Sequence, residues 1–186
     1  MIEIIGFDLD GVLGDFTSSA LAYINEKKGA SYKNHDVTDF HFIELFGLTK
    51  EEFEPFYSSH HFKSMRPLAG AQEALSRLYK RDLFVVTSRP SYLKIQTSEW
   101  LERHFKNQFH AVYFTPKIPG QKLKKSVNCK ELGLDMLVED NLEFSLECAE
   151  TGTSVLLLDH PWNQSSLLPK NVKRVYSWQE ILRELA

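Results

Sequence analysis

Only two cysteines, Cys129 and Cys148, occur among the 186 residues of the chain. Neither belongs to a Cys-x-x-Cys pair, and each lies in a stretch that we expect to be helical, so the sequence indicates neither a disulfide framework nor a zinc site. Free cysteine is among the most frequently buried residue types. We therefore expect two buried, reduced thiols.

The sequence also lacks long apolar runs and a large excess of charge of one sign. No stretch approaches the roughly 18 apolar residues of a membrane span, and the N-terminus lacks the basic segment, apolar run and cleavage site of a secretion signal. The formal net charge of −3 gives no electrostatic reason to expect duplex nucleic acid or an anionic membrane as a partner. We expect a cytoplasmic protein, whose oligomeric state does not follow from the sequence.

Repeats, low-complexity tracts and Pro/Gly-rich linkers are absent as well, so nothing separates the chain into independent domains. Hydrophobic residues make up 42% of the chain and charged residues 25%. This is the composition of an ordinary globular protein, with enough length for one good core. We expect one core domain with a small insertion.

Short apolar runs alternate with stretches of helical period along the chain. Such alternation implies right-handed crossovers and a parallel, doubly wound α/β sheet. The expected strands are residues 4–9, 83–86, 111–114, 136–138 and 154–158. The expected helices of the core are residues 71–79, 95–101, 127–132 and 178–185.

The pattern changes after the first strand, where helical stretches replace the alternation of strands and helices. We expect a catalytic core of residues 1–15 and 66–186, and a helical cap of residues 16–65 lying over the active edge of the sheet. The helices expected in the cap are residues 17–28, 37–46 and 51–57. The first is closed by Gly29, and the last is opened by a capping box formed by Thr49 and Glu52.

The cap is rich in aromatic residues, more than an exposed connection should carry. We expect most of them to pack in a core of the cap itself, with one or two facing the cleft. They include Phe40, Phe42, Phe46, Phe53, Phe56, Tyr57 and Phe62.

Two carboxylates, Asp8 and Asp10, follow the first predicted strand, and Gly11 after them permits the chain to turn. Carboxylates crowded at one strand end are unfavourable unless something neutralises them. A hard cation such as Mg²⁺ would do so, and so would the use of the pair as nucleophile and proton-transfer group. A polar turn or a calcium-binding loop is the alternative interpretation of the same run.

Polar residues also follow later predicted strands. Thr87, Ser88 and Arg89 come after the second strand, and Asp140 comes after the fourth. In parallel sheets, ligands bind outside the carboxyl ends of the strands, so residues remote in sequence reach one edge. A hydroxyl beside a helix start can hold an anion or merely cap the helix, and Arg89 faces either phosphate or solvent.

These motifs together resemble those of the haloacid-dehalogenase (HAD) superfamily of phosphohydrolases. They are Asp8-Leu9-Asp10-Gly11-Val12, Thr87-Ser88, Lys125 and Glu139-Asp140, in that order along nearly the whole chain. The string from Asp8 to Phe16, together with Pro161-Trp162-Asn163, looks most like the branch of 5′-nucleotidases and 5′(3′)-deoxyribonucleotidases. The resemblance implies an α/β, HAD-like Rossmannoid fold with a small helical cap inserted after the first strand.

The resemblance also implies catalytic and metal-binding roles. Asp8 would be the nucleophile, and Asp10 would protonate the leaving group. Mg²⁺ would be held by Asp8, the carbonyl of Asp10 and Asp140, with Glu139 in support. The superfamily often has two aspartates where this chain has Glu139 and Asp140, which leaves the geometry of the metal site open.

Phosphate binding falls, by the same resemblance, to Thr87, Ser88 and one lysine. Lys125 heads the stretch that matches the lysine motif best, while Lys122 and Lys124 remain alternatives. A lysine at a helix N-terminus would neutralise both the nucleophile and the transferred phosphoryl group. A solvated surface is the plainer interpretation of this basic cluster.

A further run, Asp159-His160-Pro161-Trp162-Asn163, follows the last predicted strand. It lacks an obvious chemical role, so we interpret it as a loop in which Trp162 packs on the edge of the core. The sequence assigns no role to the seven histidines, and we interpret His60 and His61 as a surface pair.

The predicted function is that of a Mg²⁺-dependent phosphomonoester hydrolase that forms an aspartyl-phosphate, with nucleoside 5′-monophosphates placed first among small phosphorylated substrates. One alternative is a phosphatase or phosphomutase acting on another small phosphorylated metabolite. From a different class, a phosphorylation-dependent signalling receiver or a non-catalytic binding protein remains open. The cap-sized insertion after the first strand argues against a receiver.

Overall fold

The computed structural model describes residues 2–115 and 124–185. Within them, one parallel sheet of six strands has the order β3-β2-β1-β4-β5-β6. The strands are β1 (Ile4–Phe7), β2 (Asp82–Thr87), β3 (Ala111–Phe114), β4 (Met136–Glu139), β5 (Ser154–Leu158) and β6 (Val172–Val175). β1 lies between β2 and β4, so the chain reverses direction across the sheet at β1, where open α/β sheets bind ligands.

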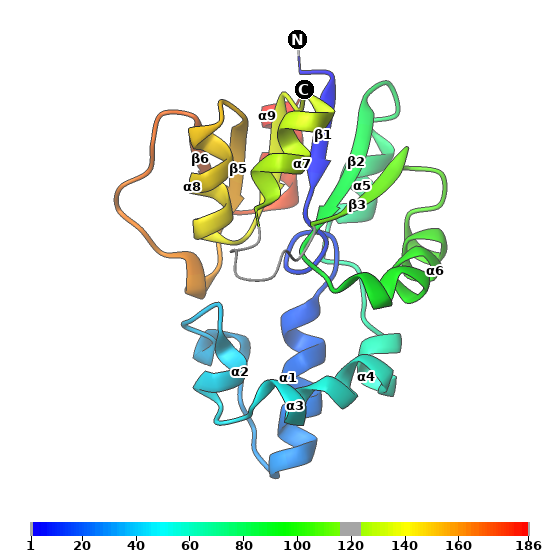
Figure 1. Ribbon diagram of the computed structural model, residues 1–186, viewed down its shortest axis with the longest axis vertical. Coiled ribbons are helices and arrows are strands. Elements are labelled where there is room, and N and C mark those ends of the chain that lie inside the picture. The colour runs from blue at the N-terminus through cyan, green and yellow to red at the C-terminus, as the bar shows by residue number, and fades with distance from the viewer. Residues whose placement is uncertain (1, 116–123, 186) are drawn as a thin grey trace.

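Helices cover both faces of this sheet (Figure 1). They are α5 (Ala71–Ser76), α6 (Lys94–His104), α7 (Lys125–Leu132), α8 (Leu142–Glu150) and α9 (Trp178–Leu185). Ile5 and Phe7 of β1 pack in one core with residues of α5, α6 and α9, whereas Val86 and Leu137 pack in the other with residues of α7 and α8. Strands buried on both faces are typical of a helix-covered parallel sheet, and the predicted doubly wound fold is confirmed.

Three details of the core differ from the expectation. The sequence pattern does not predict β6, because Val172 and Val175 enclose two charged residues and leave little apolar signal. α5 ends at Ser76 and not at Tyr79 as expected, because the next backbone N–H groups donate to the carbonyl three residues earlier. Tyr79 is 75% exposed. Ile95 in α6 is likewise exposed.

The two cysteines lie in the core between α7 and α8. Both are free and buried, as predicted, and their Sγ atoms lie 3.6 Å apart. This contact joins the helix that begins at Lys125 to the helix that follows Asp140.

Residues 16–65, the cap segment, form short helices beyond the carboxyl ends of the strands (Figure 1). They are α1 (Phe16–Lys28), α2 (Phe42–Leu45), α3 (Lys50–Phe53) and α4 (His60–Lys63), with 3₁₀ turns η1 (Asn34–Asp36) and η2 (Glu54–Ser58). Gly29 closes α1 in the left-handed region with φ 63°. Two further 3₁₀ turns, η3 (Ser91–Leu93) and η4 (Pro161–Asn163), lie in the core.

Two cap helices are shorter than the sequence predicts. In place of a helix over residues 37–46, the Asp39 carboxylate accepts the backbone N–H of His41 at 2.7 Å, a local bond that competes with the helix. α3 stops at Phe53, and Pro55 then opens a 3₁₀ turn. The predicted capping box of α3 is confirmed, since the side chains of its two members accept each other's backbone N–H groups.

The aromatic residues of the cap segment pack mainly on one another, as predicted. The buried members are Phe42, Phe46, Phe53, Phe56 and Phe62, and they share one cluster with residues of α1. Phe40 is 39% exposed and Tyr57 is half-buried. A cluster of its own supports the division into cap and core, although Leu93 and Trp162 from the core also contact it; the division stays a prediction.

The two chain crossings between the core and the cap segment run side by side. Gly14 and Pro67 form an antiparallel bridge. On one side of it, the Asp15 N–H donates to the Arg66 carbonyl at 2.9 Å, and on the other the Leu68 N–H donates to the Leu13 carbonyl at 2.7 Å. The cap segment therefore leaves the core and returns to it at one paired connection.

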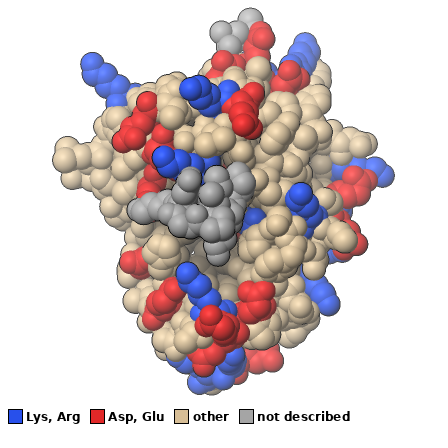
Figure 2. Space-filling model, viewed as in Figure 1, with Lys and Arg blue, Asp and Glu red and all other residues tan. Residues whose placement is uncertain are grey.

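Charged side chains of both signs are interspersed on the face of the molecule seen in Figure 2. Among the described residues, every helix is too short or too polar to cross a lipid bilayer.

Candidate active site

The chain leaves β1 through a tight loop that begins with Asp8. The Asp8 N–H donates to the Val138 carbonyl at 2.8 Å, which continues the pairing with β4. Gly11 follows with φ 81°, and a Cβ atom there would lie 2.2 Å from Oδ2 of Asp140. The left-handed backbone and the close approach both require glycine, so the loop brings Asp8 and Asp140 to one edge of the sheet.

Lys125, the first residue of α7, is completely buried between two carboxylates. Its Nζ lies 2.6 Å from Oδ1 of Asp8 and 2.7 Å from Oε2 of Glu139. A charge without water needs such partners. Lys124 is exposed, and Lys122 lies outside the described residues, so Lys125 is the described lysine that faces the predicted nucleophile.

Burial changes the proton affinity of this group of charges. It raises the pKa of Asp8 from 3.8 to about 7, because loss of water and the negative charges of Glu139 and Asp10 outweigh the attraction of Lys125. Burial alone would lower the pKa of Lys125, but the carboxylates of Asp8 and Glu139 prevail and raise it above its ordinary 10.5. The lysine therefore stays charged, and Asp8 exchanges its proton near neutral pH.

Glu139, the last residue of β4, uses both carboxylate oxygens within the protein. Oε2 contacts Lys125, and Oε1 accepts the backbone N–H groups of Asp140 and Asn141 at 3.2 Å and 3.0 Å. These bonds fix the turn that carries Asp140. Such surroundings suit the supporting role predicted for Glu139, which stays a prediction.

Asp140 presents a buried carboxylate oxygen toward Asp8. Its Oδ1 has no hydrogen-bond partner among residues 2–115 and 124–185, whereas Oδ2 accepts from the Trp162 indole at 3.2 Å. Burial, and then the charges of Glu139 and Asp8, raise the pKa of Asp140 well above 3.8. Ligand atoms of Asp8, Glu139 and Asp140 all lie within 4.8 Å of one another. A set of oxygen donors with one unsatisfied buried member fits a hard cation such as Mg²⁺.

Asp10 is held by Arg89 rather than facing the cavity freely. The guanidinium donates to both carboxylate oxygens, Nε to Oδ2 at 2.8 Å and Nη2 to Oδ1 at 2.5 Å. Arg89 is buried, with Nη1 on the Thr97 hydroxyl at 3.2 Å and its guanidinium 4.8 Å from the ring centre of Phe62 in the cap segment. A bidentate pair of this kind fixes both orientation and charge.

The predicted phosphate ligands Thr87 and Ser88 have different surroundings. Thr87 ends β2 and is buried, and its hydroxyl accepts the backbone N–H of Arg89 at 3.1 Å. Ser88 is half-buried and lines the cavity that contains Asp8, whereas Thr87 does not reach the cavity wall as the structure describes it. Both assignments stay predictions.

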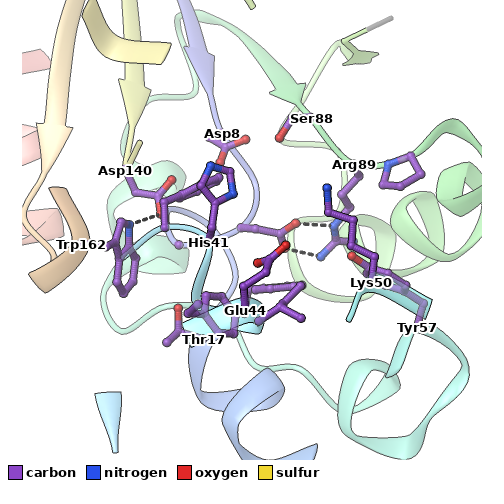
Figure 3. A pocket seen from close by; sticks show the side chains of 17 residues that line it. Asp8, Thr17, His41, Glu44, Lys50, Tyr57, Ser88, Arg89, Asp140 and Trp162 are labelled. Carbon is purple, nitrogen blue, oxygen red and sulfur yellow. Dashed lines mark hydrogen bonds and ion pairs between the residues drawn. The ribbon is translucent and has the colours of Figure 1, made fainter. Parts of the chain in front are cut away.

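One cavity joins the core and the cap segment (Figure 3). Asp8, Asp10, Asp140, Ser88 and Arg89 line it from the core. From the cap segment, its lining includes Phe40, His41, Glu44, Lys50 and Tyr57. The acidic group thus opens into a space with apolar, basic and acidic walls.

Sequence reasoning did not identify several of these contacts. The sequence leaves Arg89 facing either phosphate or solvent, and nothing in its spacing indicates a pairing with Asp10. The sequence predicts that Trp162 packs on the edge of the core, and the structure shows in addition that it lines the cavity and donates a hydrogen bond to Asp140. Its place after a strand end was the one available signal, because β5 ends beside β4 at the same edge.

Comparison with known proteins gives a consistent result. The profile of the family described as "5' nucleotidase, deoxy (Pyrimidine), cytosolic type C protein" matches residues 2–185. A 5'(3')-deoxyribonucleotidase of Bacillus subtilis is 28% identical over 189 residues, covering 100% of this chain and 99% of that protein. A nucleotidase of Clostridium acetobutylicum is 25% identical over 181 residues, covering 95% of this chain and 90% of the relative.

The fold has a solved counterpart as well. A haloacid dehalogenase-like hydrolase from Streptococcus pneumoniae superposes with a TM-score of 0.72 at 16% identity, covering 100% of this chain and 99% of that chain. At this level of identity, the likeness concerns the fold alone.

Proposed function

Because the chain belongs to the family of cytosolic type C 5'-deoxynucleotidases, and is therefore a phosphoric monoester hydrolase of HAD type, we propose that it hydrolyses nucleoside 5′-monophosphates through an aspartyl-phosphate. The HAD resemblance and the enzyme class predicted from the sequence are confirmed. The substrate class, the metal ion and the intermediate form the proposal.

The observation that carries the proposal is the buried triad of Asp8, Lys125 and Glu139 at the carboxyl edge of the sheet. In the first step, a carboxylate oxygen of Asp8 bonds to phosphorus, and the bond between phosphorus and the ester oxygen breaks. The leaving oxygen takes a proton from Asp10. Water then attacks the phosphorus of the acyl-phosphate and gives a proton to Asp10, which releases inorganic phosphate and restores Asp8.

Lys125 supports this reaction by its charge. It neutralises the nucleophile in the free protein and faces the negative charge of the transferred phosphoryl group during reaction. Asp8, the carbonyl of Asp10 and Asp140 would hold Mg²⁺, which supplies positive charge to the phosphate oxygens when bound. Ser88 stands on the cavity wall as the hydroxyl donor.

Arg89 places one condition on the proton transfer. Both carboxylate oxygens of Asp10 accept hydrogen bonds from the Arg89 guanidinium. A protonated carboxyl group donates through one oxygen and is a weaker acceptor there, so the proton that Asp10 transfers to the leaving group weakens one of these two bonds. Substrate entry next to Arg89 supplies the competing acceptor.

The proposed substrate class rests on the walls of the cavity. Phe40 and Tyr57 from the cap segment and Trp162 from the core offer aromatic surface for a base. His41 and Lys50 add polar groups at the same opening. A sugar phosphate has no planar aromatic ring to stack on this surface.

The test is phosphate release from a panel of ribo- and deoxynucleoside 5′-monophosphates and of sugar phosphates, with Mg²⁺ or with EDTA. We expect kcat/KM to favour the nucleotides by about tenfold or more, a factor that corresponds to about 1.4 kcal/mol of extra binding, and we expect EDTA to abolish turnover. Equal turnover of sugar phosphates would overturn the substrate class, and full activity in EDTA would overturn the metal assignment.

The nucleophile has its own test. Asp8→Asn keeps the size of the side chain but removes the attacking charge, so Mg²⁺-dependent phosphate release should fall to background while the circular dichroism spectrum stays unchanged. Asp10→Asn should be nearly as inactive yet still bind substrate. Retained turnover in Asp8→Asn would refute the aspartyl-phosphate.

Analysis of products for transfer of phosphate to a second substrate separates hydrolase from phosphomutase.

A further inference from the structure

The turn after β5, residues 160–163, contacts the metal-ligand candidate Asp140 through both its carboxylate and its carbonyl. We propose, building on the proposed function, that Trp162 is a positioning residue: its indole N–H fixes Oδ2 of Asp140, so that Oδ1 faces the bound cation. The residue thereby sets the affinity of the site for Mg²⁺ without touching the ion.

The two oxygens of Asp140 have unequal surroundings. Nε1 of Trp162 lies 3.2 Å from Oδ2, and the dashed line in Figure 3 shows this bond. Oδ1 is buried and has no partner in the part of the chain that the structure describes. A carboxylate bonded through one oxygen has lost its freedom to rotate, and its remaining oxygen points in one direction. Neighbours that orient a ligand in this way tune metal sites.

Trp162 is itself held in place by His160. The two rings stack at 4.2 Å between centroids with an interplanar angle of 7°. Nε2 of His160 lies 2.8 Å from the Gly11 carbonyl, which can only accept, so Nε2 carries the proton and donates. The indole is thus anchored through His160 to the loop that carries Asp8 and Asp10.

Asn163 fixes the main chain of the metal-ligand candidate. It is fully buried, and its Nδ2 donates to the carbonyl oxygens of Asp140 and Leu158, both at 2.7 Å. Its Oδ1 accepts from Arg174 of β6 at 2.7 Å. Because both N–H groups and the oxygen of this buried amide are hydrogen-bonded, its side chain is held in one orientation. The turn therefore restrains Asp140 twice, by its carbonyl and by its carboxylate.

A packing role alone would make different demands on Trp162. The ring also contacts the aromatic cluster of the cap segment, and phenylalanine would keep that contact and the stack on His160. Phenylalanine removes the indole N–H but keeps an aromatic ring for most of the packing, whereas alanine removes both. Similar Mg²⁺ affinities in Trp162→Phe and Trp162→Ala would therefore assign the effect to the hydrogen bond rather than to the packing.

The experiment measures Mg²⁺ binding to the complete, substrate-free protein by isothermal titration calorimetry. Trp162→Phe should raise the Kd by about tenfold, the lower end of the effect of such neighbours on metal affinity, and Trp162→Ala should raise it by a similar factor. The matched control is Trp100→Phe, which also removes a buried indole bond, to the Met65 carbonyl at 2.8 Å, but leaves the acidic group intact. Its Kd should stay within about twofold of wild type.

A spectroscopic readout removes the dependence on the variants' stability. In protein labelled with 5-fluorotryptophan, with the signals assigned by Trp→Phe exchange at positions 100 and 178, Mg²⁺ should shift the ¹⁹F signal of Trp162 and leave that of Trp100 in place. An unchanged Kd in Trp162→Phe, or an unmoved Trp162 signal, overturns this inference while the proposed function stands. A wild-type protein that binds no Mg²⁺ overturns both.

Discussion

At the scale of single residues, the site is a balance of buried charges. Lys125 is the sole described cation in contact with both Asp8 and Glu139, and none of the three is accessible enough to be solvated by bulk water. Removing one partner from a buried pair leaves an uncompensated charge, typically at a loss of 3–5 kcal/mol. With the role proposed for it, the lysine would contribute both to the stability of the fold and to the stabilisation of the transition state.

Exchange of the lysine tests this double role. Lys125→Met should lower the free energy of unfolding in urea by about 3–5 kcal/mol and reduce phosphate release by about a hundredfold or more. The control is Lys124→Met, one residue away and exposed, which should change the free energy of unfolding by no more than about 0.5 kcal/mol. Loss of activity in the control with an active Lys125→Met would place the functional lysine elsewhere.

The sequence identified the members of this balance but not their neighbours. Asp8, Glu139 and Asp140 can be chosen because strand ends in a parallel sheet meet at one edge, a rule that needs only the order of elements. Lys125, which heads α7 rather than ending a strand, is singled out only by the resemblance to the HAD lysine motif. Arg89 could not be assigned, since a side chain with several rotatable bonds chooses its partner by geometry that arises only after packing.

At the scale of secondary-structure elements, the core and the cap segment differ in how well local pattern determines structure. Strands with continuous apolar runs, such as β2 and β5, are placed well by their sequence because burial on both faces leaves no other interpretation. Two elements are predicted poorly from the sequence. β6 is missed because this edge strand is half polar, and the helix expected over residues 37–46 is too long because the Asp39 side chain accepts a backbone N–H group there.

Two phenylalanines of the cap segment should respond differently to truncation. Phe56 is fully buried, so Phe56→Ala should lower the free energy of unfolding by about 3–5 kcal/mol. Phe40 is 39% exposed and lines the cavity, so Phe40→Ala should change relative kcat/KM across the phosphomonoester panel with little loss of stability. Denaturation curves and panel kinetics of both variants provide the measurement. An unchanged substrate profile in Phe40→Ala would remove this residue from substrate selection.

At the scale of the whole molecule, the proposed Mg²⁺ site would link stability to metal binding through the proton on Asp8. Burial raises the pKa of Asp8 from 3.8 to about 7 in the folded protein. The stabilising contribution of this protonation is complete below the unfolded value and is lost as the pH rises through about 7. The metal-free protein should therefore become less stable over that range.

The stabilisation of the folded protein by Mg²⁺ should have the opposite pH dependence and increase as the pH rises. Cation binding requires the deprotonated carboxylate of Asp8, so the Kd for Mg²⁺ should rise by at least about tenfold for each pH unit below about 7. Asp140, whose pKa is raised as well, adds to this slope wherever it is protonated in the metal-free protein. Thermal unfolding with and without Mg²⁺, one unit either side of that pKa, should show the larger stabilisation at the higher pH. Equal stabilisation at both values would mean that Asp8 does not give up a proton to the ion.

The paired crossing at Gly14 and Pro67 affects how this protein can evolve. Because the chain exits and re-enters at neighbouring points, everything between them can be shortened, lengthened or exchanged while the ends keep their spacing. The residues proposed to bind phosphate and metal all lie outside that stretch, which contributes one side of the cavity and the contact of Phe62 with Arg89. A new substrate preference can therefore evolve through changes in one contiguous segment of the gene. A chimera that carries the corresponding segment of a homologue should show the substrate preference of that homologue.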